Sequence, residues 1–190
     1  WTPCPLDYSD SEKPLDLQAW WEGLVKYSAP LIIYFKSRWF RCLGGQLISK
    51  ALGENVTENP VKEVGWHDCH RSDSSATDDW LGDVEDPFVM FHWHSETFSV
   101  PADAQLLFSS SHCKNQAYSY GDKVLAMQCH VEMTLPLITR WITNWREDLE
   151  LETESEQNFE QINQQLATKI TALNRVADSL YGRWLASFSP

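Results

Sequence analysis

The sequence lacks an excess of positive charge and a long apolar run. Its formal net charge is −12, whereas a surface that neutralises nucleic-acid phosphates needs clustered Lys and Arg, so we expect no nucleic-acid partner. The longest apolar stretch, residues 29–35, is followed closely by Lys36 and Arg38 and is too short to span a membrane. We therefore expect no membrane partner.

The sequence also lacks paired cysteines. Its five cysteines are odd in number and scattered, which argues against a disulfide framework and favours a reducing, cytoplasmic location. Cysteines and histidines are neighbours in HDCH (67–70), HWH (92–94), HC (112–113) and CH (129–130). Structural zinc sites prefer Cys-x₂₋₄-Cys pairs, and the sequence has none. Metal binding is therefore kept only as an alternative function. We expect no metal and no cofactor.

Apolar periodicity and turn residues predict the order of helices and strands. Helices are expected over 15–28, 46–52, 134–148 and 157–187, and strands over 31–35, 60–70, 88–93, 104–110, 116–121 and 123–129. Residues 71–79 are expected to form a polar loop, and the acidic residues 147–156 a solvated connection or helix start. The pattern predicts an α/β layered protein with a partly parallel sheet and a C-terminal helical pair. The apolar stripe of the last helix favours a core or dimer contact.

One cysteine lies at the start of a predicted helix, where a nucleophile could be presented. Cys42 precedes Leu43-Gly44-Gly45, and small residues allow the backbone N–H groups to approach a ligand. His130 and Glu132 follow a predicted strand two residues apart, so in extended backbone both side chains project from the same face. If the two strands are neighbours, these residues form a Cys–His–Glu triad. From spacing alone, a packed cysteine and a surface His-x-Glu remain alternatives.

Four blocks of sequence resemble a known family. They are CLGGQLISKALG (42–53), FHWHSETFSVP (91–101), NQAYSYG (115–121) and QCHVE (128–132), and RWL closes the resemblance at Leu185. In this order they resemble a free-standing class I, triad-type glutamine amidotransferase domain of the GMP-synthase-like type. The resemblance implies a flavodoxin-like layered α/β sheet, incomplete at the N-terminus, with C-terminal helices. The domains expected are a divergent segment (1–41), the amidotransferase-like core (42–148) and a helical extension (149–190).

The resemblance also implies a reaction, the hydrolysis of glutamine to glutamate and ammonia. Cys42 would attack the side-chain amide to form a γ-glutamyl thioester, His130 would transfer protons, and Glu132 would orient the imidazole. The expected substrate-binding residues are Leu43 and Gly44 at the oxyanion, Gln46, and His94 and Ser95 at the amino-acid end of glutamine. Glutamine is the expected partner, together with a synthetase that accepts ammonia, and a second copy of the chain is a candidate partner.

The residues before Cys42 depart from the family pattern. Phe40 and Arg41 stand where the family has glycine and an aliphatic residue, and residues 1–41 contain no glycine-rich loop. We hypothesise that this segment arose from a frameshift, a mis-set exon or divergence, which reading the coding DNA in its other frames would test. Two alternative functions stay open: a catalytically impaired relic that acts as an interaction protein, and a γ-glutamyl peptide hydrolase.

Overall fold

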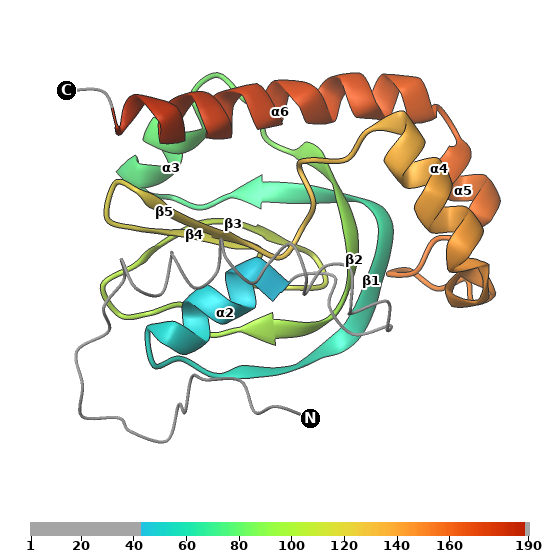
Figure 1. The fold of residues 1–190 in the computed structure, drawn as a ribbon, viewed down its shortest axis with the longest axis horizontal. Helices are drawn as coiled ribbons and strands as arrows, with labels where there is room; N and C mark the ends of the chain where they lie inside the picture. The colour runs from blue at the N-terminus through green and yellow to red at the C-terminus, as the bar shows by residue number, and fades with distance from the viewer. Residues whose placement is uncertain (1–42, 189–190) are drawn as a thin grey trace, which may run out of the picture. The chain divides into compact units, whose positions relative to one another are not determined.

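The computed structural model describes residues 43–188, which form a five-stranded sheet with helices packed against it (Figure 1). In chain order the elements are α2 (Leu43–Ala51), β1 (Val56–Arg71), α3 (Ser75–Leu81), β2 (Phe88–Phe98), β3 (Gln105–Ser110), β4 (Ala117–Tyr120), β5 (Val124–Met127), α4 (Leu135–Asn144), the 3₁₀ helix η1 (Arg146–Leu149), α5 (Phe159–Asn163) and α6 (Leu166–Ala186). The helix expected over 15–28 and the strand expected over 31–35 lie outside the described residues.

The sheet has the strand order β2-β1-β3-β4-β5, and its paired strands are all antiparallel within residues 43–188. A parallel contact in this part of the chain is the isolated bridge between Val64 and Glu156. The partly parallel sheet expected from the sequence is therefore not formed by the described strands. Each described strand reaches its neighbour through an antiparallel pairing, which needs no crossover helix.

β1 is the longest strand and pairs with different partners along its length. Most of it lies against β2, from Val56 opposite Phe98 to Cys69 opposite Phe88, with a register shift between Glu58 and Glu63. Its last residues also pair with β3. β4 and β5 form the hairpin that Gly121-Asp122 predicted, and Gly121 adopts a positive φ of 58° in the turn.

One expectation about local structure is wrong. Residues 71–79 were expected to form a polar loop, but α3 begins at Ser75 after Ser74, whose side chain accepts a hydrogen bond from the N–H of Thr77. This cap satisfies a helix-start donor, and the helix buries Trp80 and Leu81 at its other end. The polar residues that suggested a loop form the N-cap and the exposed face of a short helix.

The helices after the sheet follow their sequence signals more closely. Thr134 caps α4, and a proline lies in the first turn, as expected. The single helix expected over 157–187 is divided into α5 and α6, because Gln165 takes a left-handed φ of 54° between them. Its apolar stripe packs on the core of this chain, with Leu173, Val176 and Leu180 buried.

The core lies between the sheet and the C-terminal helices, and α6 lies along one side of the sheet (Figure 1). It includes Phe91 and Trp93 of β2 and Ile138 and Ile142 of α4. None of the helices within residues 43–188 is long and apolar enough to cross a membrane.

Candidate functional site

A histidine and a glutamate that follow β5 form a close pair. His130 Nδ1 lies 2.7 Å from Glu132 Oε1, so the imidazole can donate its Nδ1 hydrogen to the carboxylate. The His130 side chain is 9% exposed, whereas that of Glu132 is 49% exposed. The imidazole is therefore buried, and its carboxylate partner is in contact with solvent.

Packing and a backbone hydrogen bond hold His130 in place. Its N–H donates to the carbonyl of Phe91 at 2.8 Å, in an isolated antiparallel bridge to β2. The ring meets Trp141 of α4 edge to face, with centroids 5.0 Å apart. β5 has already ended at Met127, so the bridge to Phe91, rather than a continuous strand, positions this histidine.

The charge of Glu132 is maintained by its neighbour. Burial raises the pKa of this carboxyl, but the hydrogen bond and the charge of His130 outweigh it and leave the pKa below its ordinary value. An ionised carboxylate at Nδ1 sets the tautomer that leaves Nε2 as the acceptor of a further proton. This is the arrangement of a general base with an orienting carboxylate.

The start of α2 is held against β5, close in sequence to His130. A Cβ added to Gly45 would lie 2.5 Å from the carbonyl oxygen of Met127, so the two backbones approach too closely for any side chain. Ser49, one turn later, contacts Tyr118 of β4 through their hydroxyls at 2.8 Å. Gly45 thus allows α2 to begin beside the segment that leads to His130.

The other predicted site residues have different surroundings. Cys42 lies outside the described residues and immediately precedes Leu43, the first residue of α2. Gly44 is exposed and has open space around it, Gln46 is half-buried, and Ser95 is exposed. His94 is buried and paired with Glu63. The described residues therefore bring His130 and Glu132 together and place His94 in a second polar cluster.

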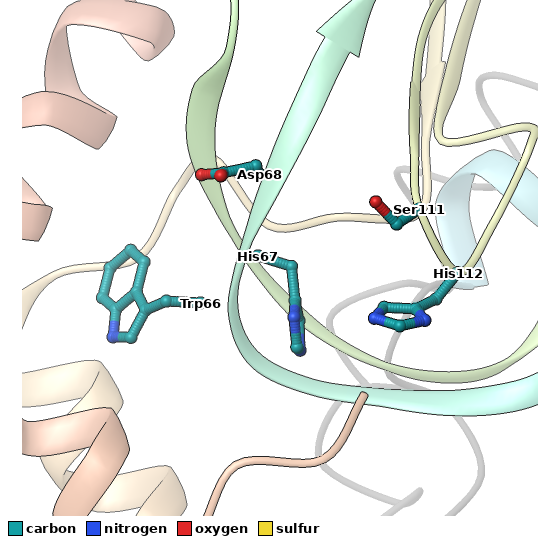
Figure 2. A pocket seen from close by; sticks show the side chains of 5 residues that line it. All are labelled: Trp66, His67, Asp68, Ser111 and His112. Atoms are coloured by element: carbon teal, nitrogen blue, oxygen red, sulfur yellow. The ribbon is translucent and has the colours of Figure 1, made fainter. Parts of the chain in front are cut away.

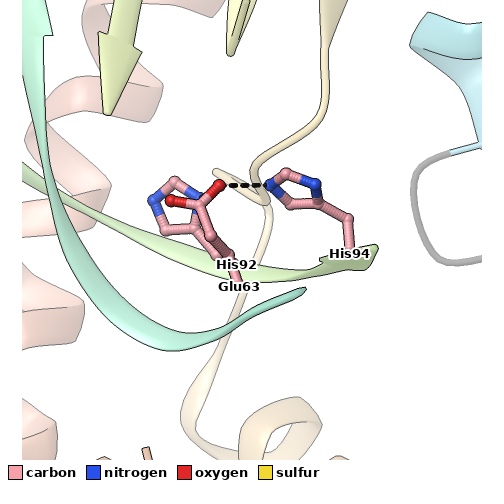
Figure 3. Close-up of side chains that lie close together, drawn as sticks. All are labelled: Glu63, His92 and His94. Atoms are coloured by element: carbon pink, nitrogen blue, oxygen red, sulfur yellow. Dashed lines mark ion pairs between the residues drawn. The ribbon is translucent and has the colours of Figure 1, made fainter. Parts of the chain in front are cut away.

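The second cluster is one that the sequence analysis missed. Glu63 of β1 lies opposite His94 of β2 in the strand register, and His92 projects from the same face two residues earlier. Glu63 Oε2 is 2.8 Å from His94 Nε2 and 3.9 Å from His92 Nδ1 (Figure 3). Ser110 and Gln116 each donate a hydrogen bond to the same carboxylate. The HWH pattern was visible in the sequence, but its carboxylate partner lies on another strand.

Burial controls the ionisation of this cluster. Desolvation raises the pKa of Glu63, yet hydrogen bonds from His94 and Ser110 and the nearby imidazoles lower it to about 2. Desolvation lowers the pKa of His92 to about 3, so this ring is neutral at neutral pH. The partners that support an ionised Glu63 at neutral pH are therefore His94 and the hydrogen-bond donors.

A surface pocket lies beside this cluster. It has a volume of about 260 Å³ and is lined by Trp66, His67, Asp68, Ser111 and His112 (Figure 2). The rings of His67 and His112 meet edge to face across it, 5.6 Å apart, and His67 also meets the buried His92 at 5.5 Å. The pocket contains neither His130 nor Glu132.

Comparison with known proteins identifies the family. The sequence profile of the glutamine amidotransferase class-I family matches residues 42–145, more than half of the chain. The chain belongs to this family. The match to the class-I glutamine amidotransferases begins at Cys42 and includes His130 and Glu132.

Individual relatives agree with this assignment. A relative in Salmonella typhimurium, the glutamine amidotransferase-like protein YfeJ, is 31% identical over 108 residues, which are 57% of this chain and 45% of that protein. The chain thus matches less than half the length of this relative. A glutamine amidotransferase structure from Methylobacillus flagellatus is 30% identical, with a TM-score of 0.75, covering 94% of this chain and 72% of that one.

A glutamine amidotransferase from Thermotoga maritima shares the fold, with a TM-score of 0.66 at 24% identity over 88% of this chain and 72% of that one. The fold is therefore of the α/β glutamine amidotransferase type. The paired strands of residues 43–188 are antiparallel.

Proposed function

We propose that this chain hydrolyses glutamine to glutamate and ammonia through a triad of Cys42, His130 and Glu132. The observation that carries the proposal is the 2.7 Å contact between His130 Nδ1 and Glu132 Oε1 in a class-I glutamine amidotransferase chain. It supplies the oriented base that a thiol nucleophile needs. The flavodoxin-like arrangement, the free-standing GMP-synthase-like type and the domain boundaries at 41/42 and 148/149 belong to the same proposal.

The position of α2 supports Cys42 as the nucleophile. The helix begins at the residue after Cys42, and the partial positive charge of a helix N-terminus stabilises a thiolate. The approach of Gly45 to Met127 holds that helix start near the segment that leads to His130. The N–H of Leu43 is the proposed oxyanion donor. The other proposed substrate contacts are Gly44, Gln46 and the chain segment of His94 and Ser95, whose backbone needs no His94 ring nitrogen to reach glutamine.

The reaction has two steps. The Cys42 sulfur gives its proton to His130 Nε2 and bonds to the side-chain carbonyl carbon of glutamine. The C–N bond then breaks, and ammonia leaves with the proton from His130. In the second step His130 takes a proton from water, whose oxygen bonds to the thioester carbon. The C–S bond then breaks and releases glutamate, and Cys42 recovers its proton from His130. The proposed recipient of the ammonia is a synthetase.

Labelling with a diazoketone analogue of glutamine tests the nucleophile. We expect one label per chain, lost in Cys42→Ala and prevented by excess glutamine, as measured by intact mass. Cys69, Cys113 and Cys129 are buried internal controls, and burial raises the thiol pKa of Cys69 and Cys113. Equal labelling of several cysteines, or none, would contradict the proposal and favour an interaction protein that has lost activity.

Turnover distinguishes the remaining alternative. A γ-glutamyl dipeptide and glutamine present the same carbonyl carbon to Cys42 but differ in the group that leaves. We expect a higher kcat/KM for glutamine, measured by glutamate release. A higher kcat/KM for the dipeptide would assign the chain to γ-glutamyl peptide hydrolysis, with the same cysteine and histidine.

A further inference from the structure

The buried Glu63–His92–His94 cluster contains polar atoms that hydrogen bonding leaves poorly matched. The ring Nδ1 of His94 lies 3.0 Å from the Glu96 carbonyl oxygen, and its Nε2 lies 2.8 Å from Glu63 Oε2. Each contact needs a ring hydrogen, and a neutral imidazole has only one. The amide nitrogen of Gln116 then faces Nε2 at 3.4 Å, donor against donor.

Two more atoms of the cluster are unsatisfied. Within the described part of the chain, His92 Nδ1 and Gln116 Oε1 are buried and have no hydrogen-bond partner. His92 is completely buried, and its Nδ1 points toward the Glu63 carboxylate 3.9 Å away (Figure 3). A buried polar atom without a partner costs stability, so it calls for an explanation, of which an ion is one.

We propose that Glu63, His92 and His94 bind one divalent transition-metal ion, for which Zn²⁺ is the best match. One ligand atom from each of the three residues lies within 4.8 Å of the other two. Tetrahedral zinc with bonds of about 2.0–2.1 Å needs ligand atoms about 3.3 Å apart. The observed separations from Glu63 Oε2, 2.8 and 3.9 Å, lie on either side of that value.

An ion resolves the mismatched contacts of the two histidines. It would replace the hydrogen on His94 Nε2 and accept the lone pair of His92 Nδ1. Gln116 would keep its hydrogen bond to Glu63, and a water molecule would complete a four-coordinate ion. Zinc accepts imidazole and carboxylate ligands together, so the donor set fits.

The surrounding atoms also match those that orient metal ligands. A ligating histidine commonly donates its other N–H to a carbonyl, as His94 Nδ1 does to Glu96. His92 Nε2 faces Cys69 Sγ at 3.8 Å, and Ser110 donates to the second oxygen of Glu63. The neighbouring pocket lies next to the cluster, because the His67 ring meets His112 at 5.6 Å in the pocket (Figure 2) and the buried His92 at 5.5 Å.

The proposed ion would be structural. Glu63 lies on β1 and the histidines on β2, so one ion ties the two strands together. The backbone of His130 is bonded to Phe91, next to His92. Occupancy of the site would therefore stabilise the strand that positions His130, without contact between the ion and the reacting atoms.

Titration of the chelator-treated full chain with ZnCl₂ tests the proposal. We expect one zinc per chain by calorimetry and elemental analysis. At a zinc concentration of a hundred times Kd, we expect Tm to rise by about 5–10 °C. Replacement of Zn²⁺ by Co²⁺ should give the intense visible absorption of a four-coordinate ion, a readout that needs no variant. Absence of saturable one-to-one binding, or a six-coordinate cobalt spectrum, would overturn the proposal.

His92→Phe is the decisive variant. It keeps a ring in the core but removes Nδ1, which has no hydrogen-bond partner, and Nε2, whose contact with Cys69 Sγ is long at 3.8 Å. The metal-free variant should therefore melt within a few degrees of the wild type. We expect its zinc affinity to fall by at least about 100-fold, because loss of a direct ligand should cost at least as much as loss of a residue that only orients a ligand. Unchanged affinity in His92→Phe would contradict the proposal.

Matched controls separate this site from other zinc ligands. His70→Gln and His112→Gln remove histidines outside the set, one half-exposed and one in the pocket, and should keep zinc affinity within a few-fold of wild type. Cys42→Ala should also retain it, which makes the test independent of the proposed glutamine hydrolysis. Loss of zinc binding in any of these three variants, with His92→Phe unaffected, would place the ion elsewhere.

Discussion

Two carboxylate–imidazole pairs in this chain have almost the same separation and very different surroundings. His130 and Glu132 are 2.7 Å apart, and His94 and Glu63 are 2.8 Å apart. The Glu132 side chain is 49% exposed, whereas that of Glu63 is completely buried. A carboxylate in contact with water can exchange protons at little cost, but a buried one must keep its partners. We therefore expect the first pair to govern activity and the second to govern stability.

Removal of the His130 imidazole should have the largest effect on activity. His130→Gln removes the proposed base and should lower kcat/KM for glutamine by at least about 10³-fold, since loss of a triad member commonly costs this much or more. Its free energy of unfolding should fall by about 1–2 kcal/mol, because the ring is buried against Trp141 and bonded to Glu132. Glutamate release and urea denaturation measure the two quantities. Activity near that of the wild type would remove His130 from the mechanism.

Removal of the buried carboxylate should have the largest effect on stability. Glu63→Ala leaves Ser110, Gln116 and His94 without their acceptor and should lower the free energy of unfolding by about 3 kcal/mol or more. Glu58→Ala, on the same strand but exposed, is the control and should change it by no more than about 0.5 kcal/mol. Equal unfolding midpoints for Glu63→Ala and Glu58→Ala would show that the burial of Glu63 does not make it more important for stability than an exposed glutamate.

Substitutions of two neighbouring glycines test how α2 is positioned beside the segment that leads to the His130–Glu132 pair. Gly45→Ala places a Cβ against the backbone of Met127 and should destabilise the chain by about 1–3 kcal/mol. Gly44→Ala meets open space and, since alanine favours helix over glycine, should be neutral or slightly stabilising. Denaturation midpoints measure both. Similar midpoints would mean that α2 does not depend on close contact with β5.

The smallest effect concerns pH. The folded-state pKa of Glu132 is below its ordinary 4.5, so its contribution to stability is present above about pH 4.5 and is lost as pH falls through the folded-state pKa. Glu132→Gln has no such titration and should lose less stability than the wild type over this range. Because the carboxylate is half-exposed, the difference should be small. Parallel acid titrations of Tm measure it, and identical curves would contradict the assigned ion pair.

Local sequence patterns predicted most of the described elements. Alternating and helical apolar spacings located β1 to β5 and α4 within a few residues, and Gly121 marked the hairpin turn. The polar letters of 71–79 concealed α3, because a helix of this length shows too little periodicity to be distinguished from a loop. The break at Gln165 was also missed, since the apolar stripe continues through it.

The candidate site also has a part that the sequence predicted and a part that it did not. His130 and Glu132 are two residues apart, so the sequence alone predicted their proximity, and four motifs in order predicted the family. Their roles, and those of Cys42 and the substrate contacts, stay predictions. By contrast, only the tertiary structure decided that Glu63 meets His92 and His94 and that Gly45 touches Met127. Such contacts depend on strand register and on the docking of a helix, which short-range patterns do not encode.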